Sequence, residues 1–277
     1  MQDMCGYMSR EGYSGFLGRE NWNRLHRVRR RIKQSDLLAV SESSRAVDAA
    51  FERILMDRFA LEAYARLHPI FELSLDPVRI DANAPQIVRL AGKAAEVASV
   101  GPMAAVPGAL ADLALEAMLK TGSRINLLEN GGEIAASSTE RLLVGIYAGQ
   151  SKHLGLGFRL RLQDFPVGIA TSSAAVSHAL SFGQADAAVI VAETACMADA
   201  VATAVCNAVK GNDSEASIQS GLETVEKIGH VRGALVLRDR HMGTVGKLPE
   251  LVRIEGGPEK MLKAGLCNSR QPDNLAA

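Results

Sequence analysis

The sequence predicts an α+β fold, and three observations support this class. Several stretches repeat apolar residues at helical spacing. Other parts of the chain contain short runs of β-like residues separated by turn residues. These segments do not follow the strict strand–helix–strand alternation of a parallel sheet, which favours α+β over α/β. The 277 residues can bury a substantial core, and no internal repeat or change of composition marks a second domain.

The first half of the chain is predicted to be mainly helical after one or two strands. Charged and apolar residues alternate over 22–41, which favours strands that can form a hairpin. Helices are predicted over 45–67, 85–100 and 107–119, and a strand over 70–80. The apolar loop at 101–108 either packs into the core or lines a ligand pocket, because pocket walls are mostly apolar.

The second half is predicted to contain mostly short strands, with helices at its centre and at 217–228. The strands are expected over 124–128, 141–147, 156–162, 185–192, 234–237 and 251–255. The segment 129–133, Glu-Asn-Gly-Gly-Glu, has two interpretations. It is either a hairpin turn, for which Asn-Gly is suited, or a place where glycine lets the backbone approach another group closely.

The stretch 168–209 contains the strongest candidates for function. It begins with a run of hydroxyls and one histidine, namely Thr171, Ser172, Ser173, Ser177, His178 and Ser181. Hydroxyls beside backbone amides are suited to phosphate or carboxylate, which accept several hydrogen bonds. His178 is either a structural histidine or a site group, because its neutral ring can donate and accept. Adjacent residues rarely place a nucleophile and a base in mutual reach, so Ser177 and His178 do not predict a hydrolase.

The end of this stretch is predicted to be an Ala- and Val-rich helix with Asp199 and Thr203 on one face. A helix this apolar is expected to be buried. A buried carboxylate without a partner is very costly. Asp199 is therefore expected to meet a cation, a hydrogen-bond donor or a metal.

Charge and cysteine content narrow the class of protein. Lys plus Arg and Asp plus Glu both number 31, so the net charge gives no case for nucleic acid or an anionic membrane as partner. The one basic cluster, at 27–33, is either a solvated edge or an anion-binding edge. Without a signal peptide or a membrane-length apolar run, a cytoplasmic location is expected. Cys196 and Cys206 are either inert buried thiols or groups for redox or sulfur-transfer chemistry.

Common phosphate-loop, dinucleotide, zinc-protease and nucleophile-elbow motifs are absent from the sequence. Six other segments occur in a distinctive order: GPMAA from 101, ENGGE from 129, GIATSS from 168, SHALSFG from 177, ADA from 185 and ADAVAT from 198. In this order they closely resemble an uncharacterised ApbE-like family, distant relatives of the FAD:protein FMN transferases. The resemblance runs from about residue 22 to residue 255.

The resemblance implies an ApbE-like fold, with antiparallel or mixed sheets packed by helices. It implies an ApbE-like domain at 22–256 between tails at 1–21 and 257–277. In the transferases, the Asp and Thr of an A-D-A-x-x-T helix help hold a divalent metal beside the pyrophosphate of the flavin dinucleotide. Asp199 and Thr203 occupy those places, so the resemblance implies a Mg²⁺ site.

The resemblance also implies a nucleotide site, with FAD or another phosphate-bearing nucleotide as its small-molecule ligand. The residues that would line it are Asn130, Gly131, Gly132, Glu133, Thr171, Ser172, Ser173, Ser177 and His178. The sequence departs from the transferases at 101–108, which has neither their Asp nor their Lys. Their His/Pro/Thr-Gly motif after the Thr-Ser segment is also missing.

Three functional hypotheses follow from these observations. The first is a metal-dependent nucleotide-binding protein that can act as a transferase. The second is a non-flavin accessory factor in sulfur assimilation and homocysteine formation, to which relatives have been linked. The third is a binding module without catalysis, because a fold alone does not fix a function. The apolar content would also tolerate a homodimer.

Overall fold

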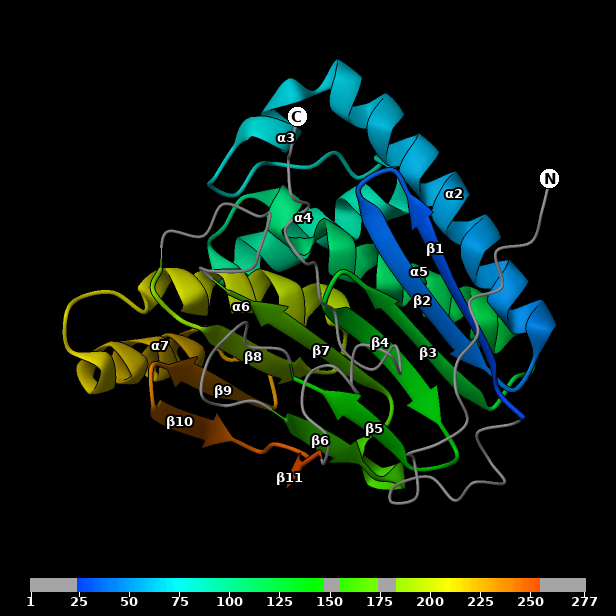
Figure 1. The fold of residues 1–277 in the computed structure, drawn as a ribbon. Helices are drawn as coiled ribbons and strands as arrows, with labels where there is room; N and C mark the ends of the chain where they lie inside the picture. Colours follow the sequence, from blue (N-terminus) through cyan, green and yellow to red (C-terminus); the bar gives the residue numbers. More distant parts are fainter. Residues whose placement is uncertain (1–23, 147–154, 174–182, 255–277) are drawn as a thin grey trace, which may run out of the picture.

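The main structural element is an antiparallel sheet of eight strands. The computed structural model describes residues 24–146, 155–173 and 183–254. The sheet has the order β1-β2-β3-β4-β7-β8-β9-β10, and all neighbouring strands run antiparallel (Figure 1). Its strands are β1 (His26–Ile32), β2 (Ser35–Ser41), β3 (Ile125–Asn130), β4 (Glu133–Ser138), β7 (Val167–Ser172), β8 (Ala187–Ala192), β9 (Gly233–Arg238) and β10 (His241–Gly246).

A smaller sheet covers the outer face of the main sheet. It has the order β11-β6-β5, from β11 (Glu250–Arg253), β6 (Leu156–Leu160) and β5 (Leu142–Gly145). The strands of the main sheet alternate their side chains between its two faces. Ile134 and Ile169 therefore pack against Phe158 of the small sheet, whereas Ala135 packs on the helical side.

Helices cover the other face of the main sheet. They are α2 (Ser44–Leu67), α3 (Pro69–Leu73), α4 (Gln86–Ala98), α5 (Val106–Lys120), α6 (Ala195–Ala208) and α7 (Ser214–Ile228), with a 3-10 turn at Pro102–Ala105. α5, α6 and α7 pack on the sheet, α4 packs against α5 and α6, and α2 runs along the outside (Figure 1). The larger core lies between the helices and the sheet, and it includes Phe51, Leu113 and Val201. The molecule thus has three layers.

The segment Pro102–Lys120 is long and apolar enough, by length and composition alone, to cross a membrane. Most of it is buried in the core instead, with Leu110, Leu113 and Met118 almost completely enclosed. Its apolar composition is therefore explained by packing against the other helices and the sheet.

The structure confirms the α+β class and most of the predicted elements. The hairpin within 22–41 is confirmed as β1–β2, and the helix over 45–67 as α2. The strand predicted over 70–80 is wrong. Pro69 begins a short helix, α3, because proline is favoured in a first helical turn, and irregular chain follows it. The segment predicted as a loop at 101–108 forms the 3-10 turn and the first turn of α5.

Three strands, β4, β7 and β10, were not among the predicted elements, and β7 covers the start of the hydroxyl run, where no strand was expected. β4 follows the diglycine segment directly, and its sequence EIAASS is too small and polar to predict a strand. β10 contains two glycines, and its side chains alternate between partly and fully exposed positions. The predicted tails at 1–21 and 257–277 lie outside the described residues, so the boundaries of the 22–256 domain stay a prediction.

Candidate functional site

A cavity of about 840 Å³ lies where β3 and β7 end and β4 begins, beside α2, α5 and α6. Its volume is in the range of small-molecule sites, and its walls combine apolar side chains with a few polar ones. Nine of the eleven residues that the sequence nominated line it: Asn130, Gly131, Gly132, Glu133, Thr171, Ser172, Ser173, Asp199 and Thr203. The other two, Ser177 and His178, lie outside the described residues. What the nine bind stays a prediction.

The diglycine segment is the turn of the β3–β4 hairpin and also part of the cavity wall. Gly131 and Gly132 have φ angles of 77° and 128°, which glycine adopts without strain. The amide of Gly131 donates to the Asp36 carbonyl at 3.1 Å, which fixes the turn against β2. Because the turn has no side chains, the cavity extends past it onto both faces of the main sheet. The two interpretations of this segment are therefore compatible.

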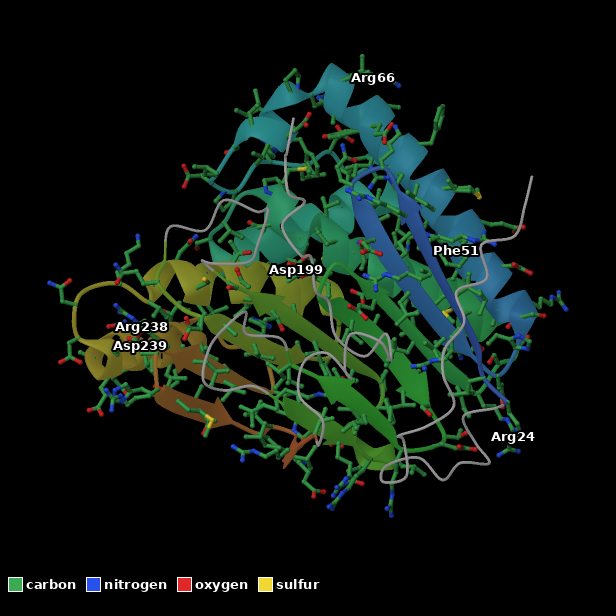
Figure 2. The ribbon with its side chains drawn as sticks, viewed as in Figure 1. Arg24, Phe51, Arg66, Asp199, Arg238 and Asp239 are labelled. Atoms are coloured by element: carbon green, nitrogen blue, oxygen red, sulfur yellow. The ribbon has the colours of Figure 1, made fainter. Side chains whose placement is uncertain are left out.

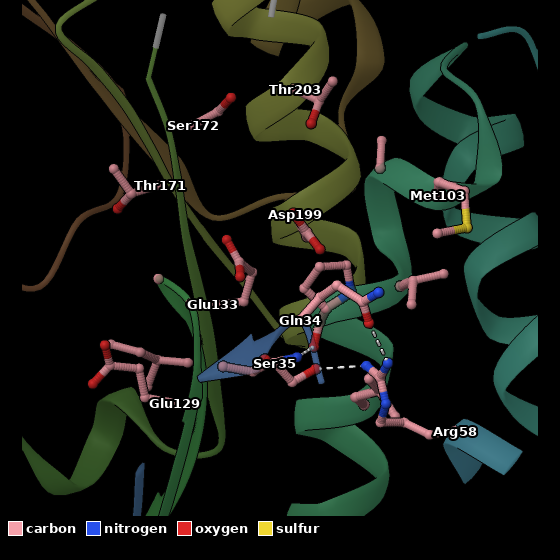
Figure 3. A pocket seen from close by; sticks show the side chains of 18 of the residues that line it. Gln34, Ser35, Arg58, Met103, Glu129, Glu133, Thr171, Ser172, Asp199 and Thr203 are labelled. Carbon is pink, nitrogen blue, oxygen red and sulfur yellow. Dashed lines mark hydrogen bonds between the residues drawn. The ribbon is translucent and has the colours of Figure 1, made fainter. Parts of the chain in front are cut away.

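We call the part of the cavity on the helical side the inner compartment. Asn130, Glu133, Ser172, Asp199 and Thr203 line it. In Figure 3, Glu133, Asp199 and Thr203 lie on one side of the strand ribbon, and Thr171 and Glu129 lie on the other. Asn130 is held in place because its Nδ2 donates to the Pro107 carbonyl at 3.0 Å.

Asp199 is buried, as the apolar helix predicted, with 7% of its surface exposed. Its Oδ2 accepts a hydrogen bond from the backbone amide of Gly108 at 2.9 Å. The expected partner is thus a donor at the start of α5. Burial raises the pKa of Asp199 well above its usual range, the Gly108 amide opposes this, and the nearby Asp112 raises it further. Figure 2 shows Asp199 in the interior of the molecule, on α6.

Gly108 is required for this contact because α5 and α6 meet there. A Cβ on Gly108 would lie 2.3 Å from the Ala195 carbonyl oxygen, which is backbone and cannot rotate away. The glycine therefore lets the start of α5 approach α6 closely enough for its amide to reach Asp199. The sequence pattern did not reveal this role, because it depends on a contact between residues far apart in the chain.

Asp112 is a second, half-buried acid that sequence reasoning did not identify. Its two carboxylate oxygens accept hydrogen bonds from the amides of Ala195 and Cys196, both at 2.8 Å. These are the first amides of α6, which have no partner within the helix. Burial raises the pKa of Asp112 to about 6, although the two amides act against this. Asp112 thus fixes the N-terminus of the helix that carries Asp199 and Thr203.

Asp199 and Thr203 fit a hard divalent cation that retains part of its own shell. Both offer oxygen atoms to the inner compartment, and Thr203 is also buried. Within the described ranges there is no group of three or more His, Cys, Asp or Glu arranged for a metal. A cation there would complete its shell with water or phosphate, which is the usual behaviour of Mg²⁺.

Four basic side chains, which we call the basic rim, also line the cavity, together with the acidic Glu62 and Glu72. The basic side chains are Arg31 and Lys33, from the basic cluster at 27–33, and Arg58 and Arg66 on α2. Arg58 is fixed, because it donates to Ser35 Oγ at 2.8 Å and to Gln34 Oε1 at 2.7 Å. The structure thus brings part of the basic cluster to the cavity. Arg58 and Arg66 were not predicted, because a charged face on an amphipathic helix looks like any solvated face.

Both cysteines of α6 are buried and form no disulfide with each other. Cys196 is buried, and its thiol donates to the Ala105 carbonyl at 3.5 Å. Burial raises the pKa of Cys196 well above its usual range, and Asp112 and Asp199 raise it further. Cys206 is fully buried. Nucleophilic sulfur chemistry needs an accessible thiolate, so the cysteine-based version of the sulfur hypothesis is disfavoured at Cys196.

Comparisons with known proteins add sequence relatives. A family model described as AbpE bacteria matches residues 19–227. A UPF0280 protein of Methanocaldococcus jannaschii is 40% identical over 228 residues, which cover 81% of this chain and 92% of the relative. A UPF0280 protein of Methanosarcina acetivorans is 36% identical over 233 residues, which cover 84% of this chain and 91% of the relative.

Two solved structures share the fold. The ApbE protein of Thermotoga maritima superposes with a TM-score of 0.57 at 12% identity, over 83% of this chain and 97% of that one. The apo form of the flavinyl transferase ApbE from Pseudomonas stutzeri gives a TM-score of 0.53 at 12% identity, over 80% and 94%. At such low identity the likeness is one of fold.

Proposed function

Because this chain belongs to the AbpE bacteria family of ApbE-like proteins, we propose that it binds a phosphate-bearing nucleotide together with Mg²⁺ in the cavity described above. The observation that supports this most is Asp199, a buried carboxylate on the cavity wall with Thr203 beside it on the same helical face. Burying an acid at a cavity is costly unless the site gains a cation or a donor there.

In this proposal the acidic and the basic residues of the cavity bind different parts of the ligand. Asp199 and Thr203 would supply oxygen ligands to Mg²⁺, which would take phosphate oxygens as further ligands. Arg31 and Arg66 at the rim carry the positive charge that a polyphosphate requires. When bound, the cation would act as a Lewis acid on a phosphoryl oxygen. The chain's own residues orient the phosphates between this cation and the basic rim.

FAD and FMN are the first ligands to test, because a solved structure of this fold is a flavinyl transferase. We propose transfer of a phosphate-containing group as the reaction, with binding as its first step. The segment 101–108 lacks the Asp and Lys of the transferases. Here it supplies the Gly108 amide to Asp199 and the apolar wall at Val106 and Pro107.

Calorimetric titration of the full chain with FAD, FMN and ATP, each with and without Mg²⁺, tests this proposal. We expect at least one nucleotide to bind, and to bind at least tenfold more tightly with Mg²⁺. Thr203→Val removes the hydroxyl ligand with little change of shape, so it should reduce the Mg²⁺ effect. Thr224→Val, at a half-buried position on α7 away from the cavity, is the matched control. Failure of all three nucleotides to bind would refute the proposal.

A further inference from the structure

The cavity continues past the diglycine turn into a second space, which we call the outer compartment. Glu129, Ile134, Val144, Ile146, Ile169 and Thr171 line it, between the main sheet and β5. The strand register aligns Leu38, Glu129, Ile134 and Ile169 across four neighbouring strands. Residues paired in this way point to the same face of a sheet. Glu129 is therefore an acid between the apolar Leu38 and Ile134.

The Glu129 carboxylate accepts no hydrogen bond and forms no close ion pair within the described part of the chain, although the charge of Arg29 acts on it. The nearest cation in its row, Arg29, donates to both oxygens of Asp36 at 2.8 and 2.6 Å, so its guanidinium is already engaged. Glu129 is only 8% exposed, and burial raises its pKa to about 7. A buried polar group without a partner is unusual in a folded protein, and it needs an explanation such as a missing ligand.

The other walls of the outer compartment define what can lie against Glu129. Ile134, Val144 and Ile169 present apolar surface, and Thr171 adds a hydroxyl that can donate or accept. A flat ring can bury its faces against such walls only if its polar edge is satisfied. N–H groups on that edge would meet the Glu129 carboxylate, and the tail of the molecule would extend past the glycines into the inner compartment.

We propose that the outer compartment binds a flat nitrogen heterocycle, and that the Glu129 carboxylate accepts hydrogen bonds from its ring N–H donors. This inference rests on the proposed nucleotide function, and it assigns the ring and the phosphates to different faces of the sheet. Guanine and flavin rings both carry such donors. Glu129 then selects the ring of the ligand, whereas Asp199 and Thr203 hold its phosphate end.

The test compares GDP, FAD and inorganic pyrophosphate, each with Mg²⁺, in calorimetric titrations of the wild type and Glu129→Gln. We expect the substitution to weaken GDP or FAD about ten- to hundredfold, since hydrogen bonds to a charged group are the strong ones. Pyrophosphate affinity should not change. Glu96→Gln, at an exposed position on α4, is the matched control. Circular dichroism verifies that both variants fold.

The outcomes separate this inference from the proposed function. If pyrophosphate binds and neither ring adds affinity, or if Glu129→Gln binds both nucleotides like the wild type, the outer-compartment proposal is wrong and phosphate binding stands. If neither pyrophosphate nor any nucleotide binds to the wild type, both proposals fail.

A separate observation concerns the outside of the molecule. Seven large apolar side chains on α2, on α3 and just after it are more than half exposed: Leu55, Met56, Phe59, Leu67, Ile70, Leu73 and Leu75. We call them the α2–α3 apolar surface. At roughly 100 Å² each they expose about 700 Å² in total. It approaches the ~800 Å² that each partner buries in a standard interface.

The sequence of α2 fits a second copy of the same helix. If two α2 helices cross antiparallel about a two-fold axis at Phe59, residue 55 of one copy lies opposite residue 63 of the other. Leu55 then faces the small Ala63, and the exposed Glu52 faces the exposed Arg66. Such a self-complementary arrangement of size and charge is what a two-fold interface requires. Figure 2 shows Arg66 at the outer end of α2.

We infer that the α2–α3 apolar surface is the interface of a homodimer, with α2 packed antiparallel on α2 at Phe59. Light scattering should give twice the chain mass for the wild type. Phe59→Cys should form an intermolecular disulfide on mild oxidation, whereas Thr224→Cys on α7 should not. Arg66→Glu should raise the dimer dissociation constant at least tenfold, and adding Glu52→Arg should restore it. A monomeric wild type would overturn this inference. So would a dimer whose dissociation constant is changed by neither Phe59→Glu nor Arg66→Glu.

Discussion

At the scale of single residues, buried acids determine how the cavity behaves. Asp199 has one backbone donor, and burial raises its pKa because it disfavours the charged form. Glu129 has no donor among the described residues, and its pKa is raised as well. Each acid costs stability when it is charged, which a bound cation or donor would offset. Binding of a cation or a hydrogen-bond donor in the cavity is therefore expected to stabilise the folded protein.

Asp199→Asn separates the charge of this residue from its hydrogen bond. The amide oxygen can still accept from Gly108, so we expect the free energy of unfolding at pH 7 to fall by no more than about 1 kcal/mol, or to rise. Mg²⁺-dependent nucleotide binding should weaken at least tenfold. Urea unfolding and calorimetry measure the two effects. Asp48→Asn, exposed on α2, is the control, and unchanged nucleotide binding would argue against a metal role for Asp199.

The raised pKa of Glu129 predicts a pH dependence with a definite sign. Its folded-state pKa of about 7 lies above its ordinary value of 4.5, and Arg29 and Asp36 are the charged groups that influence it. The contribution to stability is therefore complete below pH 4.5 and is lost as the pH rises through 7. Urea unfolding at pH 5 and pH 8 should show a loss of up to about 3 kcal/mol in the wild type that Glu129→Gln lacks. An equal pH response in both proteins would contradict this.

At the scale of elements, the contact between α5 and α6 positions the candidate metal ligands. Asp112 accepts from two amides at the N-terminus of α6, in a partly buried place. Asp112→Ala should therefore destabilise the protein by about 2–3 kcal/mol, because it leaves those amides without a partner. Asp213→Ala removes an exposed cap from α7 and should cost only about 1 kcal/mol. Urea unfolding compares them, and equal losses would show that Asp112 is an ordinary cap.

The elements also show what sequence patterns could and could not predict. Long amphipathic helices such as α2 were predicted because their apolar spacing is set by the helix itself. The strand over 70–80 was wrong because Leu73 and Leu75, which alternate with polar residues, are exposed, and of α3 only Phe71 is buried. β4 was missed because small residues suffice in a strand enclosed between two layers. The local spacing of apolar residues thus indicates the type of secondary structure, but it says little about which side chains are buried.

In the candidate site, too, the residues that a local pattern indicates were predicted, and those that depend on tertiary contacts were not. Asp199 was predicted as a buried acid because its helix is apolar all round. Glu129, Asp112 and Arg58 were missed because their roles arise from strand register and from contacts between distant segments. Nothing in a single sequence states which face of a sheet an acid will occupy until the register is known.

At the scale of the whole molecule, the small sheet and the helices should unfold together, because the main sheet forms a wall of both cores. Phe158 is fully buried between the two sheets, so Phe158→Ala should cost about 3–5 kcal/mol. The exposed Leu162→Ala should change stability by less than about 0.5 kcal/mol. Circular dichroism and fluorescence in urea should report one coincident transition. Two separate transitions would mean that the layers are independent.

The bare backbone at Gly131 and Gly132 has a consequence for the shape of any molecule that fills the whole cavity. Such a molecule has to turn a corner around the tip of the β3–β4 hairpin. It therefore needs a freely rotating joint between its head and its tail, and a stiff polycyclic compound of the same size would fit on one side only. The tip of the β3–β4 hairpin therefore selects ligands by their conformational flexibility as well as by their functional groups.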